Sequence, residues 1–132
     1  MRHIALLLGV VAIAGCAADE AQLAKSKASD AKELAVALEG RTAGKPVDCI
    51  STQSLNGPQI IGDTLLYSEV GRIWRTELAA CPGLRDDSLL VVEHHGSQMC
   101  ERDHTRILSR GSSVPGATCW MGKFTPYSRP KG

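Results

Sequence analysis

Cysteine carries most of the chemistry that this sequence of 132 residues could perform, and its five cysteines fall into two groups. Cys16 stands near the start, directly after a run of small and aliphatic residues, 4–15. A thiolate is a nucleophile that can form a thioether, pair as a disulfide or bind a metal ion. The remaining four cysteines are widely spaced: Cys49, Cys81, Cys100 and Cys119.

The apolar run ends in an aliphatic residue, two small residues and a cysteine, Ile13-Ala14-Gly15-Cys16. A basic start followed by a short apolar run is the form of a secretory signal, and a membrane-spanning helix needs about 20 apolar residues. The four-residue pattern resembles the lipobox of bacterial lipoproteins. The resemblance implies that residues 1–15 are a signal peptide, that cleavage falls between Gly15 and Cys16, and that Cys16 carries lipid. An ordinary signal peptide cut after Ala17 or Ala18 is the alternative.

The same resemblance predicts a location in the bacterial cell envelope. Two or three fatty acyl chains, such as palmitate, hold a protein on a membrane without a protein span. Ala17 follows the cysteine, where lipoproteins retained on the inner membrane usually have Asp. We therefore expect the chain to be anchored in the outer membrane and to face the periplasm, with the membrane as its first partner.

The four later cysteines predict two disulfides, because an even number in an exported domain is typical of a disulfide framework. Four cysteines allow three connectivities. A structural zinc site is disfavoured, since no two of these cysteines have the close spacing of zinc ligands.

His94, His95 and His104 offer an alternative metal site, near Cys100 and Asp103. Adjacent residues of a strand point to opposite faces, so His94 and His95 cannot both bind one ion unless the strand ends there. We expect surface histidines at a turn and predict neither a metal nor any other cofactor.

No set of side chains predicts catalysis. Several serines occur, but none lies in the G-x-S-x-G pattern of a nucleophile elbow. The adjacent carboxylates Asp86 and Asp87 follow a Pro-Gly turn, which favours a solvated loop over an acid–base pair. We expect no catalytic residues, and the sequence indicates a protein that is not an enzyme.

Charge excludes some partners. Without Arg2 of the signal, fourteen Lys and Arg balance fourteen Asp and Glu. A neutral chain has no field that would attract nucleic acid. The length left after residue 15 suits one domain, and its few aromatic residues indicate a mostly aliphatic core that disulfides would help to stabilise.

The elements that would position these residues begin with a tether and a helix. Residues 16–28 are rich in Ala and charge and resemble a tether. Asp30 and Glu33 have the spacing of a capping box, and Gly40 is placed to end a helix, so we expect a helix at about 29–39. Its apolar stripe is thin, which predicts light packing on the domain.

Strands are expected at about 47–124. Gly62-Asp63 is a two-residue turn between apolar segments 59–61 and 64–67, which predicts a hairpin. Alternation in 72–78 predicts a strand with Trp74 inside and Arg75 outside. Residues 89–92 predict a buried strand. Shorter strands are expected at 98–100, 105–108 and 119–124, with Met99, Trp120 and Met121 in the core.

The expected fold is therefore mainly β with one N-terminal helix, an α+β chain. Its sheet would be small, antiparallel or a partly closed barrel, with two disulfides. Residues 29–127 would form this single domain, residues 109–117 an exposed loop, and residues 128–132 a frayed tail.

With these residues in view, the chain resembles a family of small uncharacterised exported bacterial proteins that have four cysteines. The family has no established activity, so the resemblance implies the cysteine framework alone. We expect Cys49–Cys119 to join the first strand to the last and Cys81–Cys100 to close the middle. The matching stretches are Asp48-Cys49-Ile50, Ile61-Gly62-Asp63-Thr64, Cys81-Pro82-Gly83-Leu84, Met99-Cys100-Glu101-Arg102-Asp103 and Cys119-Trp120-Met121-Gly122-Lys123-Phe124-Thr125-Pro126.

Together these features predict a lipid-anchored envelope protein with a binding or structural role and no catalytic one. The first alternative is an inhibitor of a periplasmic or host enzyme, similar to lysozyme inhibitors, with loop 109–117 entering a cleft. The second alternative is the metal site at His94, His95 and His104.

Overall fold

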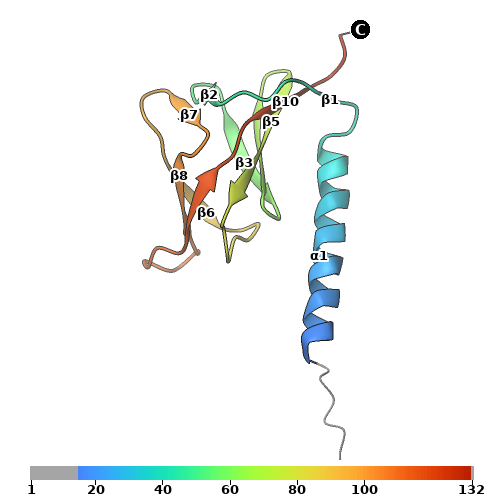
Figure 1. Ribbon diagram of the computed structural model, residues 1–132. Helices are drawn as coiled ribbons and strands as arrows, with labels where there is room; N and C mark the ends of the chain where they lie inside the picture. Colours follow the sequence, from blue (N-terminus) through green and yellow to red (C-terminus); the bar gives the residue numbers. More distant parts are fainter. Residues whose placement is uncertain (1–14, 132) are drawn as a thin grey trace, which may run out of the picture.

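The computed structural model describes residues 15–131, so residues 1–14 of the expected signal peptide lie outside the described residues. One helix, α1 (Gly15–Ala37), precedes ten strands, and every strand pair is antiparallel (Figure 1). The expected α+β fold is confirmed. The strands are β1 (Thr42–Ala43), β2 (Cys49–Ser51), β3 (Asn56–Ile61), β4 (Thr64–Glu69), β5 (Arg72–Ala79), β6 (Leu89–Glu93), β7 (Gln98–Cys100), β8 (His104–Leu108), β9 (Thr118–Met121) and β10 (Thr125–Ser128).

The helix is longer than the sequence indicated. The expected tether and the expected helix form one continuous element, and Asp30 lies within it instead of capping its start. Alanine has the highest helix propensity, and the Ala-rich segment contains no Gly or Pro that would interrupt the helix. Gly40 follows its end with a φ of 71°, as expected for a helix C-cap. No helix within residues 15–131 is both long and apolar enough to cross a membrane.

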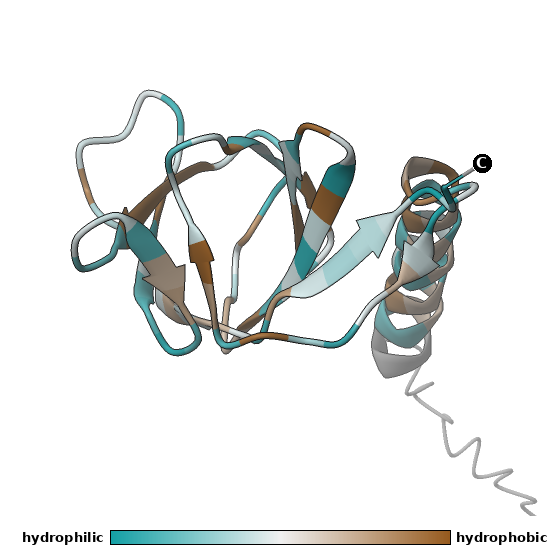
Figure 2. Cartoon of the chain, turned by 90° about the horizontal axis from the view of Figure 1, so that it is seen from above, coloured by the Kyte–Doolittle hydropathy of each residue, from teal (hydrophilic) through white to brown (hydrophobic). Residues whose placement is uncertain are grey.

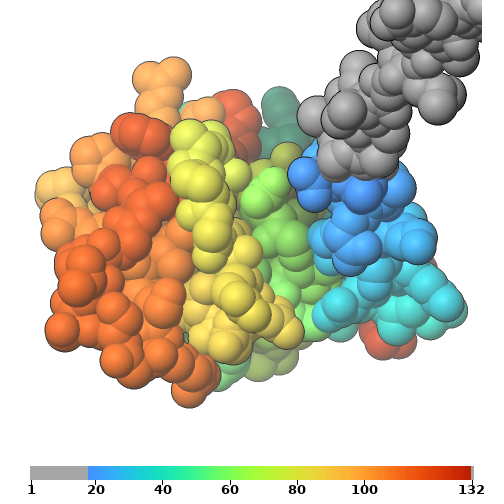
Figure 3. All heavy atoms as spheres, turned by 90° about the horizontal axis from the view of Figure 1, so that it is seen from below, coloured from blue at the N-terminus to red at the C-terminus, as the bar shows by residue number. Residues whose placement is uncertain are grey.

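Only the second half of α1 packs against the sheet, on the hairpin of β3 and β4. Ile61 is buried there, and Gln59 Nε2 donates to Glu33 Oε1 at 3.4 Å. A Cβ at Gly62 would lie 2.7 Å from a carboxylate oxygen of Asp30, so glycine lets the hairpin turn approach the helix closely. In the space-filling view the helix lies at one side of the domain, beside the green segment (Figure 3).

The sheet curls around one interior but does not close into a barrel (Figure 2). Strand β5 is its centre: β4 pairs along one edge, and β10 and β9 pair in succession along the other. The path then continues through β8 to β6. Strands β1, β3 and β6 therefore each pair along one edge only. A separate ribbon of β2 and β7 completes the fold.

The core fills the inner face of this curled sheet. Alternate residues of β5 face inward, and Trp74 is buried as expected, with the guanidinium of Arg72 4.9 Å from its ring centroid. The prediction that Met99 and Met121 are buried is confirmed. The largest fully buried side chains, in order of volume, are Phe124, Leu65, Met121, Thr76, Thr105 and Cys119.

Two expectations about burial were wrong. Leu89 and Val91 of β6 are 46% and 45% exposed, although the run of four apolar residues indicated a strand buried on both faces. Burial alternates along β6, so only one of its faces, with Leu90 and Val92, packs on the core. Trp120 is 42% exposed, because it alternates with the buried Cys119 and Met121 along β9.

The disulfides join different pairs from those expected. Cys49 pairs with Cys100 and Cys81 with Cys119. The first bond follows from register, because Cys49 and Cys100 are directly opposite in the β2–β7 ribbon. The second lies where β5 meets β9, since Ala79 pairs with Trp120 and places Cys81 beside Cys119. The expected first-to-last and middle pairs were therefore wrong.

The end of the chain is more ordered than expected. Residues 125–128 form β10, which pairs with β5 on one side and with β1 on the other. Neither strand was predicted, because β1 has two residues and β10 contains a proline. The β10 strand brings Thr125 and Tyr127 onto the outer face of β5, beside Arg75.

Candidate functional site

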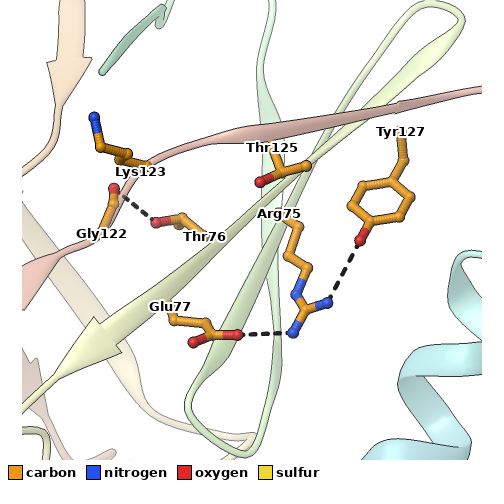
Figure 4. A pocket seen from close by; sticks show the side chains of 7 residues that line it. All are labelled: Arg75, Thr76, Glu77, Gly122, Lys123, Thr125 and Tyr127. Carbon is orange, nitrogen blue, oxygen red and sulfur yellow. Dashed lines mark hydrogen bonds and ion pairs between the residues drawn. The ribbon is translucent and has the colours of Figure 1, made fainter. Parts of the chain in front are cut away.

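A polar hollow of about 400 Å³ lies on the outer face of β5 and β10 (Figure 4). Strand β5 alternates, so Trp74 and Thr76 turn into the core while Arg75 and Glu77 turn outward. Thr125 is directly opposite Arg75 in the register. We call this site the Arg75 hollow; it is lined by Arg75, Thr76, Glu77, Gly122, Lys123, Thr125 and Tyr127.

Arg75 is held at the centre of the hollow by two partners. Its guanidinium donates to Glu77 Oε1 at 2.7 Å and to the Tyr127 hydroxyl oxygen at 3.5 Å (Figure 4). Burial acts to lower the pKa of Arg75, but the hydrogen bonds to Tyr127 and Glu77 outweigh it and raise the pKa above its ordinary value. A guanidinium has five N–H donors, so some remain for a ligand.

The floor of the hollow depends on the connection between β9 and β10. The buried hydroxyl of Thr76 donates to the Gly122 carbonyl at 3.0 Å, and Gly122 N donates to the Glu77 carbonyl at 2.9 Å. A Cβ at Gly122 would lie 2.8 Å from that carbonyl oxygen. The connection can therefore lie this close to β5 only with glycine at this position.

Lys123 closes one side of the hollow and is itself paired. Its ammonium contacts Asp48 directly and lies 3.5 Å from Glu101. The hydrogen bond and the charge of Asp48, with the charge of Glu101, raise the pKa of Lys123 above its ordinary value. The hollow thus offers donors and acceptors together, with near-neutral charge. This arrangement suits a polar ligand that both donates and accepts hydrogen bonds.

The residues that the sequence proposed for chemistry lie elsewhere. His94 uses its ring nitrogen Nδ1 in a contact of 3.1 Å with the Gly96 carbonyl, and His104 packs edge-on against Trp120 at 5.9 Å between centroids. Within residues 15–131 no three His, Cys, Asp or Glu side chains could hold a metal ion together. All four later cysteines are in disulfides, so none is a free thiol.

Sequence reasoning missed the Arg75 hollow. It placed Arg75 and Glu77 correctly on the outer face of their strand, but it left Tyr127 next to an expected frayed tail. The missing information was the pairing of β10 with β5, which the sequence alone does not specify.

Comparisons with family models, with curated proteins and with solved structures find no match to this chain. The family resemblance drawn from the cysteine pattern therefore stays a prediction.

Proposed function

We propose that this chain is a lipid-anchored protein of the bacterial cell envelope whose helix α1 holds a small binding domain away from the membrane. Helix α1 begins at Gly15, beside the proposed cleavage site, and its residues 18–29 are exposed. A helix of 23 residues is about 35 Å long. Lipid on Cys16 would therefore separate the membrane from the domain by the exposed first half of this helix, with the domain facing the periplasm from the outer membrane.

Anchoring is tested by incorporation of labelled palmitate and by membrane fractionation of the full chain. We expect label and sedimentation with membranes for the wild type, and loss of both for Cys16→Ala. Cys16 takes no part in either disulfide, so the fold should be retained. Ala17→Ser is the matched control and should keep the label. Membrane retention of unlabelled Cys16→Ala would contradict lipid anchoring.

The role that the geometry supports best is binding without catalysis, at the Arg75 hollow. The observation that carries this proposal is the position of Arg75, oriented by Glu77 and Tyr127 in a polar hollow of about 400 Å³ on the sheet's outer face. A partly buried guanidinium with free N–H groups can recognise oxygen atoms of a ligand. Carboxylate, hydroxyl and ammonium groups around it add acceptors and further donors.

A photocrosslinking amino acid at Thr125 tests this role in the native envelope. Thr125 lines the hollow, whereas Thr118 is exposed on β9 outside it and serves as the matched position. We expect a discrete adduct from position 125 that Arg75→Ala removes, and none from position 118. Identical adducts from both positions, or an adduct unaffected by Arg75→Ala, would contradict binding at the hollow.

Inhibition of an enzyme is a second candidate, favoured by the loop of residues 109–117. Val114 in this loop is 72% exposed, and Gly116 N donates to the Ile107 carbonyl at 2.7 Å, which fixes the base of the loop. A fixed loop with an apolar tip could enter a cleft. We expect Val114→Asp to abolish inhibition of lysozyme, and Val70→Asp, at another exposed valine, to leave it unchanged. No inhibition by wild-type protein at micromolar concentration would reject this candidate.

A further inference from the structure

A second cavity lies where the curled sheet fails to close. Strands β3 and β6 each pair along one edge only, and they are not hydrogen-bonded to each other. A cleft of about 270 Å³ is lined by residues of both strands. We call it the seam cleft; its lining residues are Thr52, Leu55, Gly57, Pro58, Tyr67, Leu90, Val92, His94 and Met99.

Most of the side chains that line the seam cleft are apolar, and one polar group among them has no partner. Tyr67 is only 5% exposed, and its buried hydroxyl makes no hydrogen bond with any of the described residues. Native proteins pair nearly all buried polar groups, so an orphan hydroxyl at a cavity indicates a missing partner. The lining includes no Lys, Arg, Asp or Glu, and therefore no fixed charge for an ionic ligand.

The chemistry of Tyr67 defines what that partner would be. Burial raises the pKa of Tyr67 to about 12, so the phenol is protonated and uncharged at neutral pH. Its O–H can donate one hydrogen bond to an oxygen acceptor. Trp74 is directly opposite Tyr67 on β5, and its indole N–H is also buried without a partner. The interior next to the cleft thus holds two donors and no charge.

The strand edges argue against a peptide that would complete the sheet. Pro58 has no N–H, and the register of β3 shifts between Asn56 and Gln59. Proline and a bulge on an edge strand prevent continuous pairing with an added strand. An inserted segment would therefore find a regular edge on β6 alone, which favours a small molecule as the occupant.

We propose that the seam cleft binds a small, uncharged, apolar molecule with one carbonyl or similar oxygen, which accepts a hydrogen bond from Tyr67. Leu90, Val92 and Met99 contact its apolar body, and Thr52 and His94 form the polar rim. Strand β6 is paired only with β8, so it can shift outward as the ligand reaches the hydroxyl. This site is separate from the Arg75 hollow and does not depend on the function proposed for it.

Benzophenone is a suitable probe, because it is an uncharged diaryl ketone that crosslinks to nearby C–H groups under ultraviolet light. The full chain is labelled over a range of concentrations, and the adducts are mapped by mass spectrometry of peptides. We expect saturable labelling on peptides that contain Met99 or Leu90. Labelling that does not saturate, or that maps away from the cleft, would overturn the proposal.

Two adjacent valines of β6 provide a matched pair of variants. Val92 lines the cleft, whereas Val91 points outward and is 45% exposed. We expect Val92→Phe to fill the cleft and weaken labelling at least about tenfold, since added volume excludes the ligand. Val91→Phe should label like the wild type. Equal effects of the two substitutions would overturn the assignment of the site.

Tyr67→Phe tests the hydrogen bond and keeps the proposal falsifiable should Val92→Phe fail to fold. The variant retains the ring and removes only the unpartnered hydroxyl. Loss of one neutral hydrogen bond should raise the half-saturating benzophenone concentration about three- to tenfold. Diphenylmethane, which lacks the carbonyl, should compete equally well in both proteins. An unchanged half-saturating concentration in Tyr67→Phe would overturn the role of Tyr67.

Discussion

The Arg75 hollow on β5 and β10 and the seam cleft between β3 and β6 differ in how their polar groups are satisfied. In the Arg75 hollow the charged groups already have partners, and the side chain of Glu77 is 64% exposed. In the seam cleft a hydroxyl is buried without a partner. Water can satisfy polar groups on the outer face, whereas the inner face has to satisfy them with protein or ligand atoms.

This contrast teaches where single side chains matter for stability. Exposed ion pairs contribute little to the free energy of unfolding, because solvent screens them. Buried apolar and aromatic side chains contribute several kilocalories per mole each. Substitutions on the inner face should therefore lower the free energy of unfolding far more than substitutions on the outer face.

The largest effect is expected for the two tryptophans. Trp74→Ala removes a side chain that is 8% exposed in the core, and it should lower the free energy of unfolding by about 3–5 kcal/mol. Trp120→Ala, at a site 42% exposed, should cost less than about 1 kcal/mol. Urea denaturation followed by circular dichroism measures both. Equal losses would show that the inner and outer faces are not energetically distinct.

Removal of one disulfide should have the next largest effect. The bonds span 51 and 38 residues, so chain entropy predicts about 4 kcal/mol for each. Cys119 is fully buried, whereas Cys49 is exposed. We therefore expect Cys81→Ala/Cys119→Ala to lower the free energy of unfolding further than Cys49→Ala/Cys100→Ala, since it also loses core packing. The reverse order, measured in urea, would contradict this assignment of the core.

Alkaline pH should reveal the burial of Tyr67. Its pKa is about 12 in the folded chain against 10.0 for an ordinary tyrosine. Between these values the unfolded chain loses the proton first, so stability is complete below pH 10 and falls as pH rises to 12, by about 2–3 kcal/mol in all. Tyr67→Phe should remove most of this fall, and Tyr127→Phe on the outer face should not. A Tyr67→Phe variant with an unchanged slope of stability against pH would refute the buried phenol.

The smallest effect is expected at the Arg75 hollow. Arg75→Ala should change the free energy of unfolding by less than about 1 kcal/mol, because its pair with Glu77 is partly exposed. Arg106→Ala removes a similar exposed pair with Glu93 and provides the control. A loss above about 2 kcal/mol for Arg75→Ala, measured by urea denaturation, would indicate that the hollow is structural and not a binding surface.

Local pattern explains the parts of the fold that could be predicted. The Gly62-Asp63 turn and the alternation along β5 depend on neighbouring residues, and both predictions are confirmed. The predicted start of the helix at about residue 29 was wrong. The capping pattern at Asp30 was given more weight than the continuous stretch of helix-forming residues before it. The prediction that 89–92 is buried on both faces was wrong, because an apolar run does not reveal whether one or both faces of its strand are covered.

The sequence by itself determined which residues could meet: an even set of cysteines, an alternating strand at 72–78, a two-residue turn and a motif at Cys16 that predicts lipid. Tertiary structure alone decided which of them do meet. Strand register paired Cys49 with Cys100, the return of β10 placed Tyr127 over Arg75, and the unclosed sheet left Tyr67 at a cleft. The physical reason is that pairing between distant strands depends on the packing of the whole sheet, whereas turns and alternation depend on a few adjacent residues.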